Sequence, residues 1–374
     1  MGTRLRVLAA GDANNFRIIR LFAASAVILS HGYIVNGGYA AIARDPLERL
    51  TSIDSGELAV DIFFVTSGFL VTNSLLRRRD ALDFLISRVL RITPALVVAV
   101  LVAALVVGPV TTELPLATYF RTRALYSYVV IDSLSISPFH FRYQLPGVFE
   151  HLPATGVVNA PLWTLPWEIW MYGALLLLFL IHGLGRAFPV ILAAIVGVYS
   201  LVALGLVEMG TNGAIASRLL AFFFVGVAMA RYAGRVTISL AVLAVVTMLF
   251  ALVSLASHSA VLLPEWLGYA VLYVAYAPAM VVRRWSKGPD FSYGIYIYAY
   301  LVQQLLVWSI GPHAPLLNAA IALVLTAPLA AISWYCIEAP SLALKTRLRG
   351  RLAVRRAAKL ESVATGGTIA ERAA

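Results

Sequence analysis

The chain has 374 residues, of which 61% are hydrophobic and 13% charged, and its formal net charge is +11. Soluble domains contain about 45–50% apolar and ~25% charged residues, so this composition excludes an ordinary soluble protein and predicts an all-α integral membrane protein. The positive charges stand between apolar runs rather than along one face. This pattern sets membrane orientation, so we expect no binding to nucleic acid.

Ten apolar segments are long enough to cross a bilayer, and we expect them to form a single bundle with a central pore. They cover residues 16–36, 57–76, 84–108, 160–182, 187–207, 214–232, 236–256, 260–282, 291–311 and 315–342. The predicted membrane domain therefore spans residues 16–345, between an N-terminal segment (1–15) and a basic tail (346–374).

The loops between these segments differ in positive charge. If the chain alternates across the membrane, one side holds Arg4, Arg6, Arg17, Arg77, Arg78, Arg79, Arg186, Arg231, Arg235, Arg283, Arg284, Lys287 and the basic tail. The opposite loops hold only Arg44, Arg49, Arg121, Arg123 and Arg142. By the positive-inside rule both termini are cytoplasmic, which predicts a multi-pass protein of the inner (plasma) membrane. A long loop at about 109–159 is then extracytoplasmic, either functional or a simple interfacial cap.

The first segment carries Arg20 and His31, eleven residues apart. In a helix this step spans roughly 16 Å and returns to almost the same face. Ionisable groups inside a membrane are costly and usually mark a functional site, although Arg20 can also be a snorkelling anchor and His31 a packing residue.

Alternating topology places a set of polar residues in the outer half of the bundle. They are His31, Asp61, Trp163, Glu168 and Arg218. A carboxylate bonded to one ring nitrogen fixes a histidine tautomer and raises its basicity, so we expect Asp61, or alternatively Glu168, to pair with His31.

A second polar set lies at the inner end. Arg88 and Arg91 stand three residues apart and, with Arg20, offer guanidinium groups suited to phosphates. Tyr293 and Glu338 fall at the same level. The alternative is ordinary membrane anchoring with an Arg–Glu pair. Together the two sets predict a channel in which a cytoplasmic coenzyme A thioester reaches His31.

Six sequence blocks, taken in order, resemble those of the membrane-bound acyltransferase-3 family, the O-acetylases of bacterial surface polysaccharides and related acceptors. The early blocks are Arg20 with His31, the stretch AVDIFFVTSGFLVT with Asp61, Ser67 and Gly68, and SRVLRITP with Arg88, Arg91 and Pro94. The later blocks are WTLPWEIWMY with Trp163, Thr164, Glu168 and Tyr172, FSYGIYIY with Ser292, Tyr293 and Tyr296, and IEAP with Glu338 and Pro340. The resemblance covers about residues 13–345. Family members often carry a histidine where this chain has Ala299.

The resemblance implies an O-acyltransferase that moves an acetyl or other short acyl group from acyl-coenzyme A to a hydroxyl of a glycan or glycolipid. We assign catalysis to His31, Asp61 and Glu168. Donor binding is assigned to Arg20, Arg88, Arg91, Tyr293 and Glu338, and acceptor binding to Ser67, Trp163 and Arg218. Acetyl-coenzyme A and membrane lipids are the expected partners. No metal is expected, because no His, Cys and carboxylate cluster has ligand spacing.

Two other classes of function remain open from the sequence. A transporter of glycan precursors or lipid-linked sugars could use His31 and Asp61 as a proton relay, but the inverted repeats common in transporters are absent. A non-catalytic scaffold would tolerate charge-neutral replacement of Arg20 and His31.

Overall fold

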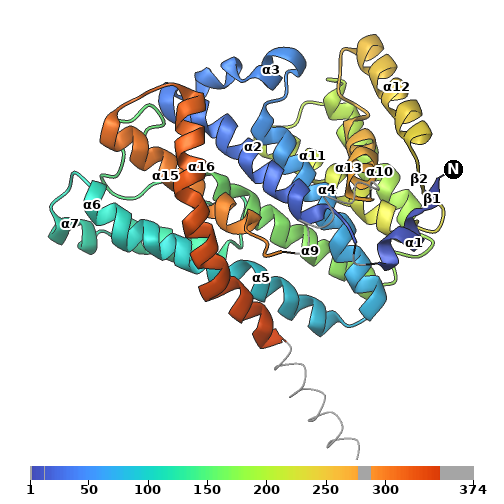
Figure 1. The fold of residues 1–374 in the computed structure, drawn as a ribbon, viewed down its shortest axis with the longest axis horizontal. Helices are drawn as coiled ribbons and strands as arrows, with labels where there is room; N and C mark the ends of the chain where they lie inside the picture. Colours follow the sequence, from blue (N-terminus) through green and yellow to red (C-terminus); the bar gives the residue numbers. More distant parts are fainter. Residues whose placement is uncertain (1, 12, 277–287, 346–374) are drawn as a thin grey trace, which may run out of the picture.

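The computed structural model describes residues 2–11, 13–276 and 288–345. Within these ranges the chain is almost entirely helical, and its one sheet consists of two short strands (Figure 1). The predicted all-α fold is confirmed. Part of the eighth predicted segment, the basic residues Arg283, Arg284 and Lys287, and the predicted tail (346–374) lie outside the described residues.

The first half of the chain supplies four long helical runs and several short connectors. The long runs are α2 (Phe16–Gly37), α4 (Ser55–Arg78), α5 (Ala81–Val102) continued by the π turn η2 (Ala103–Val107) and α6 (Gly108–Thr111), and the turn η3 (Ala160–Trp163) continued by α9 (Thr164–Leu180). The connectors are α1 (Leu5–Ala10), η1 (Tyr39–Arg44), α3 (Pro46–Thr51), α7 (Leu116–Arg121) and α8 (Arg123–Leu134).

The second half adds six more helices around this core. They are α10 (Phe188–Ala203), α11 (Thr211–Arg231), α12 (Leu240–Ser257), α13 (Leu263–Tyr276), α15 (Ser292–Ile310) and α16 (Pro315–Ser333), the last continued by the π turn η4 (Trp334–Glu338).

Seven helical runs in the described part of the chain are long and apolar enough to cross a membrane, which supports a multi-pass membrane protein. They are α2, α4, the run 81–111, the run 160–180, α11, α12 and the run 315–345. Helices also occupy the other three predicted segments, but α10 has only 16 residues and neither α13 nor α15 is among the seven. Ten spans, the orientation and the pore therefore stay predictions.

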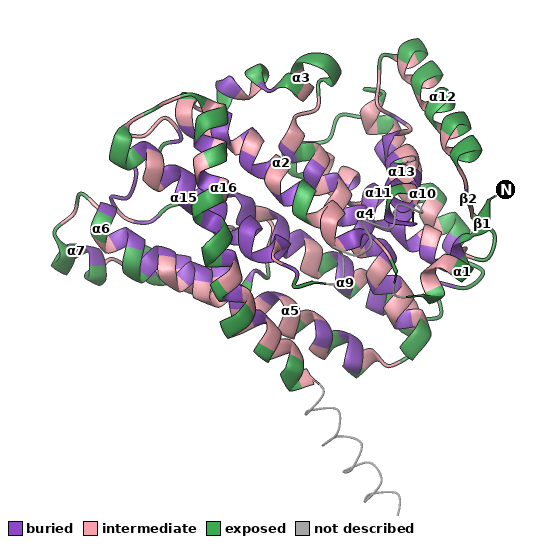
Figure 2. Cartoon of the chain, in the orientation of Figure 1, coloured by how far each residue is buried: buried purple, intermediate pink, exposed green. Residues whose placement is uncertain are grey.

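Helices α12 and α15 show the two extremes of burial. Helix α12 lies at the edge of the bundle and has no buried residue, so almost all of its apolar surface is available to lipid (Figure 2). Helix α15 is buried on most of its surface and keeps Gln303 and Gln304 fully inside. Its buried polar side chains lower its hydropathy, which explains why a central helix is not one of the seven.

Two glycines allow α4 and α11 to pack closely. A Cβ atom on Gly68 would lie 2.1 Å from the carbonyl oxygen of Phe223, and one on Gly226 would lie 2.3 Å from that of Val65. Small residues let helix backbones approach in this way, and the contact fixes how α4 is rotated in the bundle.

The predicted extracytoplasmic loop is partly helical. Helix α8 packs against α5, and the Tyr119 hydroxyl of α7 donates to the Ala104 carbonyl oxygen at 2.7 Å. Asp132, near the end of α8, is fully buried and accepts a hydrogen bond from the Arg142 backbone N–H at 3.0 Å. Its other oxygen has no hydrogen-bond partner among the described residues. Burial raises the pKa of Asp132 to about 8.

The N-terminal segment is folded onto the bundle. Strand β1 (Thr3–Arg4) pairs antiparallel with β2 (Thr237–Ile238), which follows α11. The Arg4 guanidinium donates to the Arg235 carbonyl oxygen at 2.8 Å. These contacts hold α1 against the ends of α4 and α11 (Figure 1).

Candidate active site

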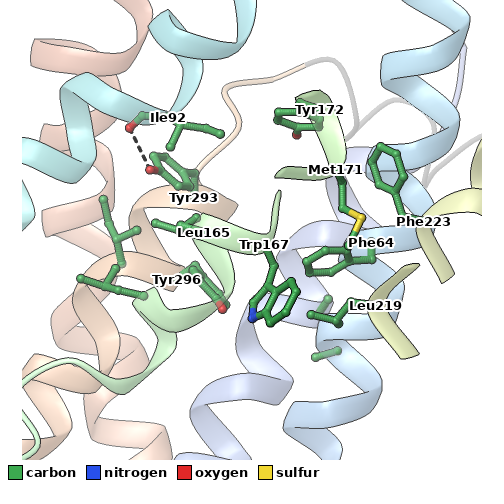
Figure 3. Packing of buried hydrophobic residues seen from close by; sticks show 14 of the residues in the cluster. Phe64, Ile92, Leu165, Trp167, Met171, Tyr172, Leu219, Phe223, Tyr293 and Tyr296 are labelled. Atoms are coloured by element: carbon green, nitrogen blue, oxygen red, sulfur yellow. Dashed lines mark hydrogen bonds between the residues drawn. The ribbon is translucent and has the colours of Figure 1, made fainter. Parts of the chain in front are cut away.

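A cavity of about 110 Å³ lies between α2, α4, α5, α9 and α15. Its walls are mostly aromatic and aliphatic, and Figure 3 shows Phe64, Ile92, Leu165, Tyr293 and Tyr296 among them. Six of the predicted site residues line it, namely Arg20, Ser67, Arg88, Arg91, Glu168 and Tyr293. The cavity therefore joins residues from the predicted inner set with Glu168, which alternating topology assigned to the outer half, and with Ser67.

Two of the three arginines in the cavity share one carboxylate. Arg20 and Arg91 both contact the same oxygen of Asp290, at 2.9 and 2.7 Å, and the Ser292 hydroxyl donates to the other oxygen at 2.6 Å. Burial alone would raise the pKa of Asp290, but the two guanidinium groups outweigh it and hold that pKa well below its usual value. Asp290 is therefore ionised and neutralises part of the charge expected for phosphate binding.

Arg91 has a second counter-ion in Glu338. The two side chains meet at 3.2 Å, and the Ser333 hydroxyl donates to the other Glu338 oxygen at 3.1 Å. Glu338 is 2% exposed, does not line the cavity and contacts Arg91, so its expected role in donor binding stays a prediction. The alternative of ordinary membrane anchoring predicted an Arg–Glu pair, and Arg91 with Glu338 forms such a pair.

Tyr293 also supports Arg91 from within the wall. Its hydroxyl donates to the Ile92 carbonyl oxygen at 2.9 Å, the dashed line in Figure 3, and its ring lies 5.6 Å from the Arg91 guanidinium carbon. The hydroxyl is therefore engaged by the backbone of α5 and holds that helix beside α15.

Arg88 differs from its neighbour Arg91. It forms no ion pair with any described carboxylate, and its guanidinium carbon lies 5.5 Å from the centre of the Tyr172 ring. Because it also lines the cavity, Arg88 is the guanidinium best placed to meet an anionic ligand.

Glu168 stands on the other side of Tyr172. One of its oxygens accepts hydrogen bonds from the Ser67 hydroxyl, at 3.0 Å, and from the Tyr172 hydroxyl. Its second oxygen accepts no hydrogen bond from a described residue and remains available to a ligand. The cavity wall thus carries a cation, Arg88, and a carboxylate, Glu168. The two are not paired with each other, and both contact the Tyr172 side chain.

His31 does not line the cavity. It is half-buried, and its ring meets the edge of Tyr300 with 5.0 Å between ring centres. Tyr296 lines the cavity, and Tyr300 follows it by four residues on α15, which is about 6 Å further along the helix axis. Arg20 lines the cavity and lies on the same face of α2 as His31, so the cavity adjoins the face of α2 that carries His31.

The expected pair of Asp61 and His31 is not present. Both oxygens of Asp61 are occupied by the Arg218 guanidinium, at 2.7 to 3.3 Å, and Arg218 also contacts Glu57 at 2.8 Å. Neither Asp61 nor Arg218 lines the cavity. The alternative partner, Glu168, is held by hydroxyl groups instead.

A carboxylate close to His31 in the fold is Asp54, the N-cap of α4. It accepts a hydrogen bond from the hydroxyl of Ser30, the residue before His31, at 2.7 Å. Sequence reasoning missed both Asp54 and Asp290. Asp54 had a signal, since Asp54 and Glu57 stand at the spacing of a helix start. Asp290 offered only its position just before the late Ser-Tyr block.

Trp163, expected on the acceptor side, does not line the cavity. It ends η3, where it packs against the main hydrophobic core. The next residue, Thr164, does reach the cavity and bonds the Tyr296 hydroxyl at 2.7 Å. The turn around Trp163 therefore shapes the wall through Thr164.

Comparisons with known proteins agree with this architecture. A family model described as "Acyltransferase domain" matches residues 14–336. An O-acetyl transferase of Shigella phage Sf6 is 30% identical over 351 residues, covering 87% of this chain and 95% of the relative. Nodulation protein 10 of Rhizobium leguminosarum bv. viciae is 27% identical over 382 residues, covering 92% and 97%. No solved structure matches the chain significantly.

The fold and the cavity define a multi-pass membrane protein with a charged internal site. The match over nearly its whole length shows that the chain belongs to the acyltransferase-3 family, as its six blocks predicted. It is an acyltransferase, and the relatives support transfer to an oxygen atom. This assignment favours the enzyme over the transporter and the scaffold.

Proposed function

We propose that this enzyme transfers an acetyl or other short acyl group from acyl-coenzyme A to a hydroxyl of a cell-surface or exported glycan or glycolipid, such as a lipopolysaccharide or exopolysaccharide. The observation that carries the proposal is the cavity lined by Arg20 and the unpaired Arg88, beside α2, which carries His31 on the same face as Arg20. The relative named as an O-acetyl transferase supports the acetyl group.

The inner end of the cavity suits a phosphorylated donor. Arg20 and Arg91 are held in place by Asp290, so they can donate remaining N–H groups without strong local repulsion. Arg88 adds a cation without a protein counter-ion, which favours one anionic group. The phosphates of coenzyme A meet this requirement, and the aliphatic and aromatic walls suit its long pantetheine arm.

The reaction joins the acceptor oxygen to the thioester carbonyl carbon and breaks the carbon–sulfur bond. The hydroxyl proton passes to a general base and finally to the departing thiolate, so no other reactant is needed. We assign the base to His31, with Asp54 rather than Asp61 as the carboxylate that polarises it. Glu168, with one oxygen free in the cavity, is the second basic group near the path.

The proposed orientation places the donor on the cytoplasmic side of the inner membrane and the acceptor outside. A surface cavity of about 1070 Å³, lined mostly by the 109–159 loop, gives an acceptor room on that side. Tyr39, Arg123 and Tyr143 line it with aromatic and basic groups. Aromatic rings and donor groups of this kind suit a sugar chain.

The test is acyl transfer by the purified protein from radiolabelled acetyl-coenzyme A to the cell's own surface glycans. We expect His31→Ala to lower transfer at least about hundredfold, the usual effect of losing a general base, while membrane insertion is unchanged. His140→Ala, in the exposed loop, is the matched control and should keep full activity. A fully active His31→Ala protein would rule out the assigned role.

Arg88 tests the donor end separately. Arg88→Gln should raise KM for acetyl-coenzyme A about tenfold or more with a smaller change in kcat, because one charged hydrogen bond to phosphate is lost. Arg88→Lys should recover part of that affinity. An unchanged KM in Arg88→Gln would show that the phosphates bind elsewhere.

A further inference from the structure

A second cavity, of about 550 Å³, opens at the surface where α4 and α11 end. It shares no lining residue with the cavity of the candidate active site. Four arginines line it, and no acidic residue does; the four are Arg6, Arg77, Arg231 and Arg235, which we call the arginine pocket. None of them forms an ion pair with a described carboxylate.

The pocket is built by segments far apart in the chain. The backbone N–H groups of Leu5 and Arg6 donate to the carbonyl oxygens of Val236 and Ala233, each at 2.9 Å. This contact brings α1 beside the turn that follows α11. The Arg6 side chain lies over that turn, since its Cδ atom would be 3.9 Å from a Cβ atom on Gly234.

Several guanidinium groups are fixed by the backbone and still have N–H groups to spare. The Arg231 Nε donates to the Leu184 carbonyl oxygen at 2.8 Å, and Arg77 donates to that of Ala10 at 3.4 Å. Arg231 and Arg235 also flank the Tyr232 ring, with their guanidinium carbons 5.5 and 5.7 Å from its centre. A guanidinium has five N–H donors, so most remain available to an anion.

The position of the pocket points to a lipid. Both α4 and α11 are long and apolar enough to span a membrane, so their ends lie at the level of the phospholipid headgroups. Basic pockets between membrane helices on the cytoplasmic side bind anionic headgroups, and tyrosine is enriched at the membrane–water interface. The shared chemistry is a phosphate group carried by a headgroup or by a soluble phosphate.

We propose that the arginine pocket binds the headgroup of an anionic phospholipid, such as phosphatidylglycerol or cardiolipin. The site is independent of the acyl-transfer chemistry. It anchors the N-terminal segment and the ends of α4 and α11 to the inner leaflet.

The test measures lipid retention by native mass spectrometry of the purified full chain, titrated with phosphatidylglycerol, cardiolipin or phosphatidylcholine. We expect the anionic lipids to bind more tightly than phosphatidylcholine. Arg6→Gln combined with Arg235→Gln should weaken anionic binding about 25-fold, since each basic residue near the surface contributes about fivefold. Neither side chain donates a hydrogen bond to a described residue, so we expect the variant to fold.

Arg79→Gln is the matched control, because Arg79 is exposed at the same end of α4 but does not line the pocket. It should bind as the unaltered protein does. If the Arg6→Gln, Arg235→Gln variant and the Arg79→Gln control retain anionic lipid equally, the arginine pocket is not the binding site. Displacement of bound lipid by millimolar pyrophosphate would overturn the lipid assignment in favour of a soluble phosphate, whereas failure to displace it supports the headgroup. Arg6→Lys with Arg235→Lys should restore most of the binding.

Discussion

Asp290 and Asp132, two of the carboxylates buried outside the predicted spans, have opposite environments. Asp290, at the inner end of the cavity, lies between the guanidinium groups of Arg20 and Arg91. Asp132, in the outer loop, accepts one backbone N–H and has an oxygen with no partner among the described residues. Burial acts on both, yet the pKa of Asp290 is lowered and that of Asp132 is raised to about 8.

The difference shows what a buried carboxylate needs to stay charged. Desolvation disfavours the ionised form, and close cations together with hydrogen bonds to that form offset it. The inner region supplies two cations, so its carboxylate is a fixed part of the site's charge. The outer region supplies none in contact, so its carboxyl group keeps a proton over much of the physiological pH range. Low pH should therefore destabilise the inner region, and high pH should destabilise the outer region.

The largest effect is expected at Asp290. Asp290→Asn leaves Arg20 without its counter-ion and Arg91 with only Glu338, and breaking a buried ion pair in this way costs about 3–5 kcal/mol. The free energy of unfolding, measured in detergent at pH 7, should fall by that amount. Because the folded pKa is depressed, the wild-type contribution is present above about pH 4 and is lost as pH falls through the folded value.

Glu150→Gln provides the control, since this glutamate is exposed and forms no ion pair with a described residue. It should leave stability within about 0.5 kcal/mol of the unaltered protein. A similar loss in both variants would mean that the ion pairs of Asp290 contribute nothing specific.

The next effect is a pH dependence from Asp132. Its folded pKa of about 8 exceeds the unfolded value, so the folded state holds one extra proton between about pH 4 and 8. Stability should therefore decrease as pH rises, by about 2 kcal/mol between pH 6 and 8. Thermal unfolding in detergent at several pH values measures this.

Asp132→Asn should remove that slope, because an amide cannot titrate and can still accept from the Arg142 backbone N–H. At pH 8 the variant should be the more stable protein. If the stability of Asp132→Asn depends on pH in the same way as that of the wild type, another group causes the pH dependence. Asp132 and Asp290 then do not differ in the way described above.

The smallest effect on stability is expected at Arg88. Arg88→Gln removes a cation that has no described counter-ion, so only its contact with the Tyr172 ring is lost, about 0.5–1 kcal/mol. Arg91→Gln, one helical turn away, should cost several times more because Asp290 and Glu338 lose a partner. Comparable losses in the two variants would show that Arg88 has a structural partner.

Much of the helical framework was predictable from the sequence. The length of the first apolar run predicted the ends of α2 to within one residue. The spacing of eleven residues between Arg20 and His31 predicted that both lie on one face of this helix. Arg88 and Arg91 were also predicted to share a site with Arg20, and all three line one cavity. Periodicity and spacing are local properties, so a single helix carries them.

The charge pairing could not be predicted because depth along the membrane does not give the rotation of a helix. Asp61 and His31 were placed at one depth, but Asp61 lies seven residues before Gly68 and so shares its face within about 20°. That glycine face packs on α11, which carries Arg218. Ser67, one residue away, turns toward the cavity and Glu168.

The paired strands near the N-terminus have a consequence for the order of assembly. Arg4 and Arg235 are 231 positions apart, yet they are hydrogen-bonded in the finished protein. A ribosome adding about 5–20 residues per second needs on the order of ten to fifty seconds to cover that distance. Throughout this interval β1 has no strand to pair with. The arginine pocket therefore forms only after α11 and β2 have been synthesised, so the segment around β1 is seated long after it is made.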